Sequence, residues 1–125
     1  MTLFLLASGG ALGALARYRL GAFILRKKKH TFPLGTFLIN VSGALLLGII
    51  CGMGVGGNPY VLFGDGFCGA FTTFSTFTVE SVQLVHEHAK KKAAAFILLS
   101  CSAGMACFSA GYFAADFLKL IAFSY

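Results

Sequence analysis

Charged residues are scarce in this chain of 125 residues, and acidic ones are the scarcest. Only 11% of the side chains are charged, against 58% hydrophobic. That balance is far too apolar for a soluble domain of this size. The four acidic residues are dispersed: Asp65, Glu80, Glu87 and Asp116. No Ser-His-Asp set accompanies them, so we expect no enzyme. No acid lies deep in the first apolar segment or is expected to face a cavity, which disfavours a proton-coupled multidrug exporter.

The four cysteines lack a metal-binding spacing. No Cys-x-x-Cys pair occurs, and the four cysteines all lie in apolar segments: Cys51, Cys68, Cys101 and Cys107. We therefore interpret them as free, small apolar residues. Low-complexity linkers and strand-like alternation are missing as well, so the sequence predicts a single helical domain over residues 1–125.

Four long apolar segments remain, at about residues 2–25, 32–53, 61–85 and 93–121. Each reaches the roughly 20 residues that a helix needs to cross a bilayer. Pro33 lies where a second helix would begin, which suits proline. The sequence GGNP at residues 56–59 predicts a turn before the third segment. The predicted fold is an all-α membrane protein with four transmembrane helices.

Basic residues gather on one side of this predicted bundle. Residues 26–29 and 90–92 supply seven lysines and arginines to the first and third loops, whereas Lys119 is the single basic residue near the other side. The positive-inside rule then places those two loops in the cytoplasm and both termini outside the cell membrane. The same placement explains the net charge of +6 better than a nucleic-acid partner would.

The stretch GFCGAFTTFSTF, residues 66–77, does not suit a plain spanning helix. Glycine and β-branched threonine weaken helices, and threonine hydroxyls compete for backbone hydrogen bonds. Irregular backbone at membrane depth is tolerated only where protein or a polar cavity surrounds it. This stretch therefore predicts a break in the third helix and a functional site beside it.

Two polar side chains interrupt faces of small residues on the first two segments. Small residues recur every four positions there, as on Gly9, Gly13 and Gly21 or on Ala44, Gly48 and Gly52, which favours close helix packing. Arg17 lies on the first face, and it either borders a wet vestibule or pairs with an acid such as Asp65 or Glu80. Asn40 lies on the second, and it either donates to a ligand or bonds another helix.

Two phenylalanines of the third segment share a helical face. Phe74 and Phe77 are three residues apart, among several hydroxyl side chains. A phenyl ring has an electropositive edge, so ring edges and hydroxyls together can meet an anion without a fixed positive charge. Ordinary packing against lipid or core is the alternative interpretation of such a pair.

Three motifs together carry a family resemblance. They are GGALGALARY at residues 9–18, GTFLINVSGALLLG at 35–48 and GFCGAFTTFSTF at 66–77. In this order, on three of four predicted helices, the combination resembles the Fluc/CrcB family of fluoride channels. The resemblance implies a dimer of antiparallel four-helix subunits with two pores along the interface. It implies passive, fluoride-selective export of cytoplasmic fluoride, which confers fluoride resistance.

The resemblance also implies roles for particular residues. Phe74 and Phe77 would present ring edges to fluoride, with Asn40 donating a hydrogen bond near them. Hydroxyls would form a polar track along the pore: Ser75, Thr76, Thr36 and Ser100. Arg17 would attract anions to a vestibule. The backbone carbonyls of Gly69 and Thr72 would hold a structural Na⁺ at the dimer centre.

The charge bias leaves the dimer's composition open. A homodimer of antiparallel subunits needs one chain to insert in both orientations, which favours balanced loops rather than seven basic residues against one. The sequence therefore predicts one half of a heterodimer with an oppositely oriented paralogue, with a homodimer as the alternative. A coupled exporter and a non-conducting assembly subunit are the competing functions.

Overall fold

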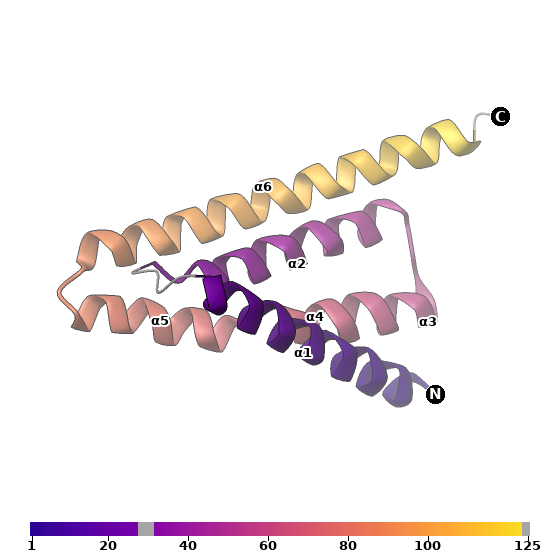
Figure 1. Cartoon of the computed structure of the whole chain (residues 1–125). Helices are drawn as coiled ribbons and strands as arrows, with labels where there is room; N and C mark the ends of the chain where they lie inside the picture. The colour runs from indigo at the N-terminus through magenta and orange to yellow at the C-terminus, as the bar shows by residue number, and fades with distance from the viewer. Residues whose placement is uncertain (28–31, 124–125) are drawn as a thin grey trace.

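The computed structural model describes residues 1–27 and 32–123, and it is helical almost throughout (Figure 1). Two long helices come first, α1 (Thr2–Lys27) and α2 (Leu34–Gly52), and α6 (Lys90–Phe123) comes last. Between them lies a third helical stretch in four pieces: α3 (Gly57–Tyr60), the π-helix η1 (Val61–Cys68), α4 (Gly69–Phe71) and α5 (Phe74–His86). The described residues contain no strand, so the predicted all-α class is confirmed. The rest of the first basic loop, residues 28–31, lies outside the described residues.

The helices form a bundle in which α2 packs along α6, α1 packs across η1 and α4, and α5 leads back to α6. Figure 1 shows the N-terminus of α1 and the C-terminal end of α6 at the same end of the bundle. The connection between α5 and α6 lies at the opposite end. The four helical stretches thus run up and down, as short loops between long helices require.

Glycines make the two main helix contacts possible. A Cβ atom on Gly9 or Gly13 of α1 would collide with the backbone of η1, and one on Gly48 or Gly52 of α2 would collide with the backbone of α6. Both predicted small-residue faces are therefore confirmed as packing faces, in which the absence of a side chain lets two backbones approach closely.

The helix boundaries differ from prediction at one informative place. The chain does turn between the second and third stretches, at residues 53–56, but the third stretch begins at Gly57, so the turn predicted at GGNP extends three residues too far. Gly57 adopts a positive φ of 64°, which glycine tolerates, and Pro59 falls in the first helical turn. A proline is accepted there because the first backbone N–H groups of a helix have no partner within it.

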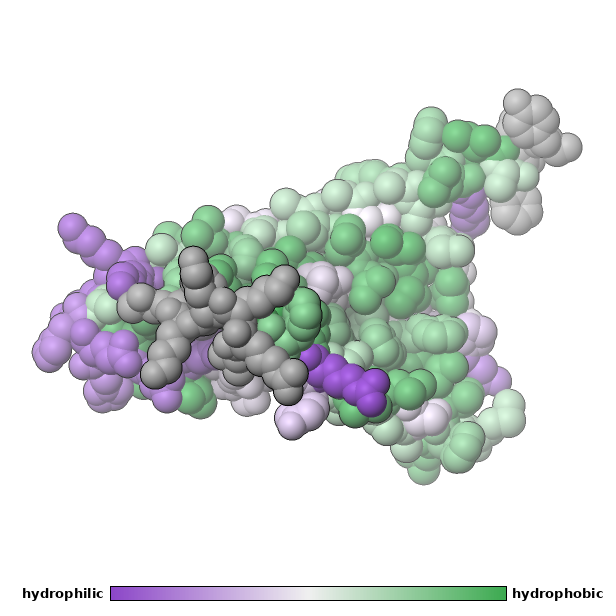
Figure 2. Space-filling model, viewed as in Figure 1, coloured by the Kyte–Doolittle hydropathy of each residue, from purple (hydrophilic) through white to green (hydrophobic). Residues whose placement is uncertain are grey.

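Apolar side chains cover much of the outer surface. Figure 2 shows hydrophobic residues over the length of the bundle and hydrophilic ones gathered at the end where α5 meets α6. Among the described helices, α2 and α6 are each long and apolar enough to cross a membrane. Little of either is buried within the chain. So much exposed apolar surface is characteristic of a protein whose helices contact lipid or another subunit.

Candidate functional site

The third helical stretch is interrupted at two threonines within the GFCGAFTTFSTF motif. Helix α4 ends at Phe71, Thr72 and Thr73 have extended backbone (ψ 159° and 115°), and α5 begins at Phe74. Thr73 is only 8% exposed. The Thr72 N–H still donates to the Cys68 carbonyl, but the Thr72 carbonyl and both backbone groups of Thr73 lose their helical partners and need others.

Asn40 of α2 supplies those partners. The backbone N–H of Thr73 donates to Asn40 Oδ1 at 2.8 Å, and Asn40 Nδ2 donates to the Thr73 carbonyl at 3.0 Å. One side chain thus satisfies both backbone groups of a residue 33 positions away. Of the two interpretations of Asn40, the structure shows the bond to another helix. Its amide carries a second N–H that Thr73 does not use.

Arg17 of α1 contacts the interruption from the other side. Its Nη1 donates to the carbonyl of Thr72 at 3.2 Å, while the Thr72 hydroxyl donates to the carbonyl of Cys68 at 3.0 Å. Within the described residues no ion pair joins Arg17 to Asp65 or Glu80. The guanidinium is therefore held at mid-helix by a backbone carbonyl that α5 cannot use.

Hydroxyl groups cluster where α5 begins. Thr73 is the N-cap: its Oγ1 accepts from the Thr76 backbone N–H at 3.3 Å and donates to Thr76 Oγ1 at 3.0 Å. Ser75 Oγ lies 3.4 Å from the same Thr73 oxygen. A helix N-terminus of this kind favours negative charge because its N–H groups point outward. Thr73 was not a candidate from the sequence, although a threonine directly before a helical run is a typical N-cap signal.

A cavity of about 600 Å³ lies between α1, α2 and α5. Five polar residues discussed above line it: Arg17, Thr36, Thr73, Thr76 and Glu80. Thr36 is buried, and its hydroxyl bonds the Glu80 carboxyl. The other carboxyl oxygen of Glu80 is buried without a partner in the described part of the chain. The expectation that no embedded acid faces a cavity is therefore wrong, since α5 turns Glu80 inward.

The two predicted phenylalanines have different surroundings. Their ring centroids are 6.1 Å apart with planes tilted by 37°, so they do lie on one face of α5. Phe74 is 80% exposed, whereas Phe77 packs on a small core of Leu84, Ala93 and Phe96. One ring is thus anchored within the chain, and the other is presented at its surface.

The remaining candidates lie apart from this cavity. Gly69 is exposed and, with Asn40 and Thr72, lines a second hollow of about 440 Å³ between α2 and the third stretch. In an unbroken helix the Gly69 carbonyl would accept from the Thr73 N–H, which here goes to Asn40 instead. Ser100 of α6 lines neither hollow, and its hydroxyl is buried without a partner among the described residues.

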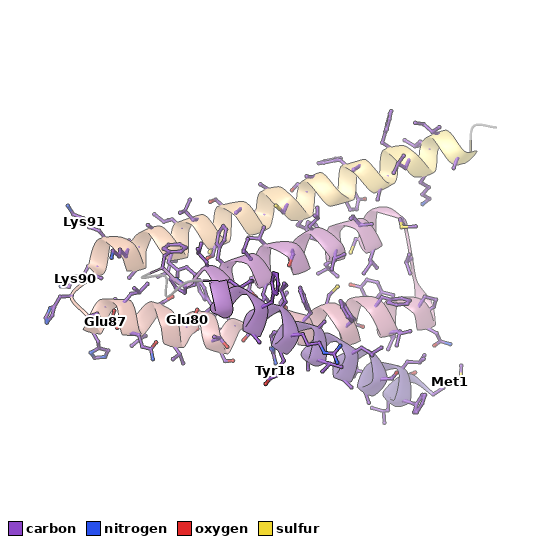
Figure 3. The ribbon with its side chains drawn as sticks, in the orientation of Figure 1. Met1, Tyr18, Glu80, Glu87, Lys90 and Lys91 are labelled. Atoms are coloured by element: carbon purple, nitrogen blue, oxygen red, sulfur yellow. The ribbon has the colours of Figure 1, made fainter. Side chains whose placement is uncertain are left out.

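The charged end of the bundle is separate from these residues. Figure 3 shows Lys90 and Lys91 extending outward from the beginning of α6, with Glu87 near the end of α5. His88, in the turn between the two helices, has a positive φ of 58°. These groups form a polar end of the bundle, and Glu87 among them also lines the cavity.

Known proteins are similar in sequence to this chain over most of its length. The family described as CrcB-like protein, Camphor Resistance (CrcB), matches residues 4–112. A Clostridium acetobutylicum protein named fluoride-specific ion channel FluC 2 is 45% identical over 113 residues, which cover 90% of this chain and 97% of that protein. A Bacillus cereus protein of the same name is 48% identical over 94 residues, covering 75% and 77%. Fluoride-specific ion channel FluC 1 of Carboxydothermus hydrogenoformans is 38% identical over 117 residues, covering 94% and 95%. The chain belongs to the CrcB family.

Proposed function

We propose that this chain is a subunit of a fluoride-selective channel in the cell membrane, through which fluoride leaves the cytoplasm passively. The observation that carries the proposal is the interruption fixed by Asn40. It sets the start of α5, with its hydroxyls and its Phe74 and Phe77 rings, beside a polar cavity. The printed names of the relatives support fluoride as the ion.

The chemistry of this region suits a small, strongly hydrated anion. A pore must replace the water around the ion with donors, yet bind it weakly enough to release it. Hydroxyls of Ser75 and Thr76 and the electropositive edges of phenyl rings are such donors, and they carry no fixed charge. A narrow path lined in this way excludes the larger chloride. Fluoride that enters cells as the weak acid HF would then leave down the membrane potential, which would give fluoride resistance.

The path begins at the cavity and continues along α5. Arg17 draws anions into the cavity, where Thr76 provides the first hydroxyl of the polar track. Thr36 joins the track when its hydroxyl turns from the Glu80 carboxyl toward the ion. Phe77 and Phe74 follow, with the unused Asn40 amide N–H beside them. Ser100 joins the track through a hydroxyl that has no other partner in the described chain.

The pore is completed by a second, antiparallel subunit, which gives a dimer with two pores. Support comes from groups that one chain leaves uncovered: the Phe74 ring, the exposed Gly69 and the hollow of about 440 Å³ beside it. The seven-to-one charge bias favours a heterodimer with an oppositely oriented paralogue, with a homodimer as the alternative. In this chain's orientation, the α5–α6 turn with residues 90–92 is cytoplasmic and the termini are outside.

The same hollow fits a structural Na⁺ at the dimer centre. The Gly69 carbonyl loses the Thr73 N–H as its helical partner, and Gly69 is exposed beside this hollow, so a hard carbonyl oxygen is free to act as a ligand. The Thr72 carbonyl already accepts from Arg17, so it can offer only its second lone pair. Two carbonyls from one chain are a partial ligand set, which an equivalent pair from the second subunit would complete. The bound cation would supply positive potential near the pores.

A single flux experiment tests the channel. Liposomes containing the purified protein are loaded with fluoride, and release is followed with a fluoride electrode beside a chloride control. We expect rapid fluoride release with chloride retained, and loss of flux in Phe74→Ile with the dimer intact. Phe113→Ile, which replaces an α6 ring that is also largely exposed (68%, against 80% for Phe74), should conduct normally. Normal flux through Phe74→Ile would refute the role of that ring. If the chain alone releases no fluoride, it is reconstituted together with an oppositely oriented paralogue. Absence of fluoride release from those liposomes as well would refute the channel.

A proton-coupled exporter is the second candidate, and the inward-facing Glu80 favours it. Such an exporter needs an embedded acid that changes its protonation state during transport. The two functions differ in their energy source. Fluoride release that is as fast without a pH gradient as with one, and that persists in Glu80→Gln, supports the channel. Release that requires the gradient supports the exporter.

A further inference from the structure

Phe77 rests on another aromatic ring that the motifs do not include. Its ring centroid is 5.1 Å from that of Phe96 on α6, with the planes tilted by 43°. Phe74, the other ring of the pair, is 80% exposed and has Phe77 as its aromatic neighbour in the described chain. Within one subunit, the orientation of the Phe77 ring is therefore set largely by its contact with Phe96.

Phe96 is itself the most firmly enclosed large side chain of the molecule. Its exposure is 0%, and no other large side chain among the described residues is as fully buried. Leu84 and Ala93 share its core cluster, and Phe32 meets it edge to face, with centroids 5.4 Å apart and planes at 90°. Phe37 in turn packs on Phe32 at 6.3 Å. Phe32, which lies just before α2, and Phe37 on α2 thus pack against the cluster that holds Phe96 in place.

The orientation of a pore ring matters because its electrostatic effect changes sign with angle. The edge of a phenyl ring is electropositive and attracts an anion, whereas its face is electronegative and repels one. A side chain that rotates freely about χ2 would present both. A flat partner at 5.1 Å restricts that rotation, and a branched aliphatic side chain of similar volume would do so much less well.

We propose that Phe96 is a positioning residue for fluoride conduction: it holds the Phe77 ring with its edge toward the ion path. This inference rests on the proposed channel function and on Phe77 as a pore ring. Phe96 does not touch the ion. It acts through the shape of its ring, since it carries no polar atom.

Two substitutions in the same core cluster separate positioning from mere stability. Phe96→Leu keeps an apolar side chain but removes the flat partner of Phe77. Leu84→Ala removes buried volume from the same cluster and keeps both aromatic rings. At equal amounts of folded, dimeric protein in liposomes, we expect Phe96→Leu to lower fluoride flux at least tenfold and Leu84→Ala less than threefold. Phe96→Tyr, which keeps the ring, should recover most of the flux if it folds. Equal flux losses in Phe96→Leu and Leu84→Ala would overturn the proposal.

A measurement of the ring itself does not depend on conduction. Phe77 is replaced by 3-fluorophenylalanine, whose fluorine lies off the χ2 rotation axis and therefore reports the orientation of the ring, and its fluorine NMR signal is recorded in detergent. We expect one sharp, shifted line in the otherwise unsubstituted protein, a broadened or displaced line in Phe96→Leu, and little change in Leu84→Ala. An unchanged line in Phe96→Leu overturns the positioning role, whether or not the protein conducts. If the unsubstituted protein shows no fluoride flux in any assay but the NMR line changes in Phe96→Leu as expected, the channel function is refuted and the contact between the two rings is supported.

Discussion

Removal of the Asn40 side chain should destabilise the fold far more than its position on an apolar helix suggests. In the unsubstituted protein the Thr73 N–H and carbonyl bond Asn40 at 2.8 and 3.0 Å. Asn40→Ala leaves both groups without partners, at a residue whose exposure is only 8%. An unsatisfied buried polar group costs about 1–3 kcal/mol. Two such groups, one of them partly relieved by water from the adjacent cavity, cost about 2–4 kcal/mol. The expected loss thus exceeds that of most single substitutions.

The expected change is large enough to measure by thermal unfolding in detergent. For a chain of this length, 1 kcal/mol corresponds to roughly 4 °C in Tm, so Asn40→Ala should melt about 8–16 °C lower by far-UV circular dichroism. Asn40→Leu, which restores the bulk but not the hydrogen bonds, should melt nearly as low. Ser42→Ala is the matched control on the same helix, because that hydroxyl bonds only its own helix, at Ile39.

Hydrogen exchange locates the effect. The amide of Thr73 should exchange slowly in the unsubstituted protein and much faster in Asn40→Ala, while amides in the middle of α6 change little. The reasoning is refuted if Asn40→Ala melts within about 2 °C of Ser42→Ala, or if the Thr73 amide remains protected.

Three further predictions follow from the helix contacts and from Arg17. Gly13→Ala should destabilise the bundle, because its Cβ would collide with the backbone of Phe67. Gly10→Ala should be tolerated, because its Cβ would lie 3.9 Å from the Ala70 Cβ, an ordinary contact. Equal melting temperatures of the two variants would contradict this prediction. Thr73→Val removes the N-cap hydroxyl and should cost about 1–2 kcal/mol, also read by melting; an unchanged Tm would exclude the cap. Arg17→Gln should lower fluoride flux several-fold at low salt and less at high salt; a salt-independent loss would point to a structural role instead.

Much of the helical framework follows from hydropathy and from the spacing of small residues. Apolar segments long enough to cross a bilayer predict α1, α2 and α6 within a few residues, and the glycine faces predict which sides of α1 and α2 pack. The start of the third stretch did not follow, because a proline in a turn and a proline in a first helical turn have the same local sequence. Gly57 and Pro59 belong to the second kind.

The sequence predicted many of the residues that form the candidate site, but not which of them contact one another. Poor helix formers indicate irregular backbone somewhere in residues 66–77, yet the partner that fixes it, Asn40, lies 33 positions from Thr73. Two extended residues also reset the rotation of the helix that follows. The faces of residues after Thr73 therefore cannot be extrapolated from those before it, and Glu80 could not be assigned to the cavity. Phe96 was unpredictable for another reason: a helix that is apolar all round does not reveal which side is buried.

The length of α6 has a consequence for how the protein is seated in a bilayer. Its 34 residues extend over about 50 Å, whereas the hydrocarbon layer is about 30 Å thick. Even a tilt of about 40°, near the limit for membrane helices, accommodates only about 39 Å of helix inside. The surplus must emerge, and both ends are suited to do so: Lys90 and Lys91 at one, Asp116 and Lys119 at the other. The charges at the two ends of α6 are about a membrane's width apart and would stay in the two aqueous interfaces. They would thereby set the position of α6, and of the interrupted helix beside it, along the membrane normal.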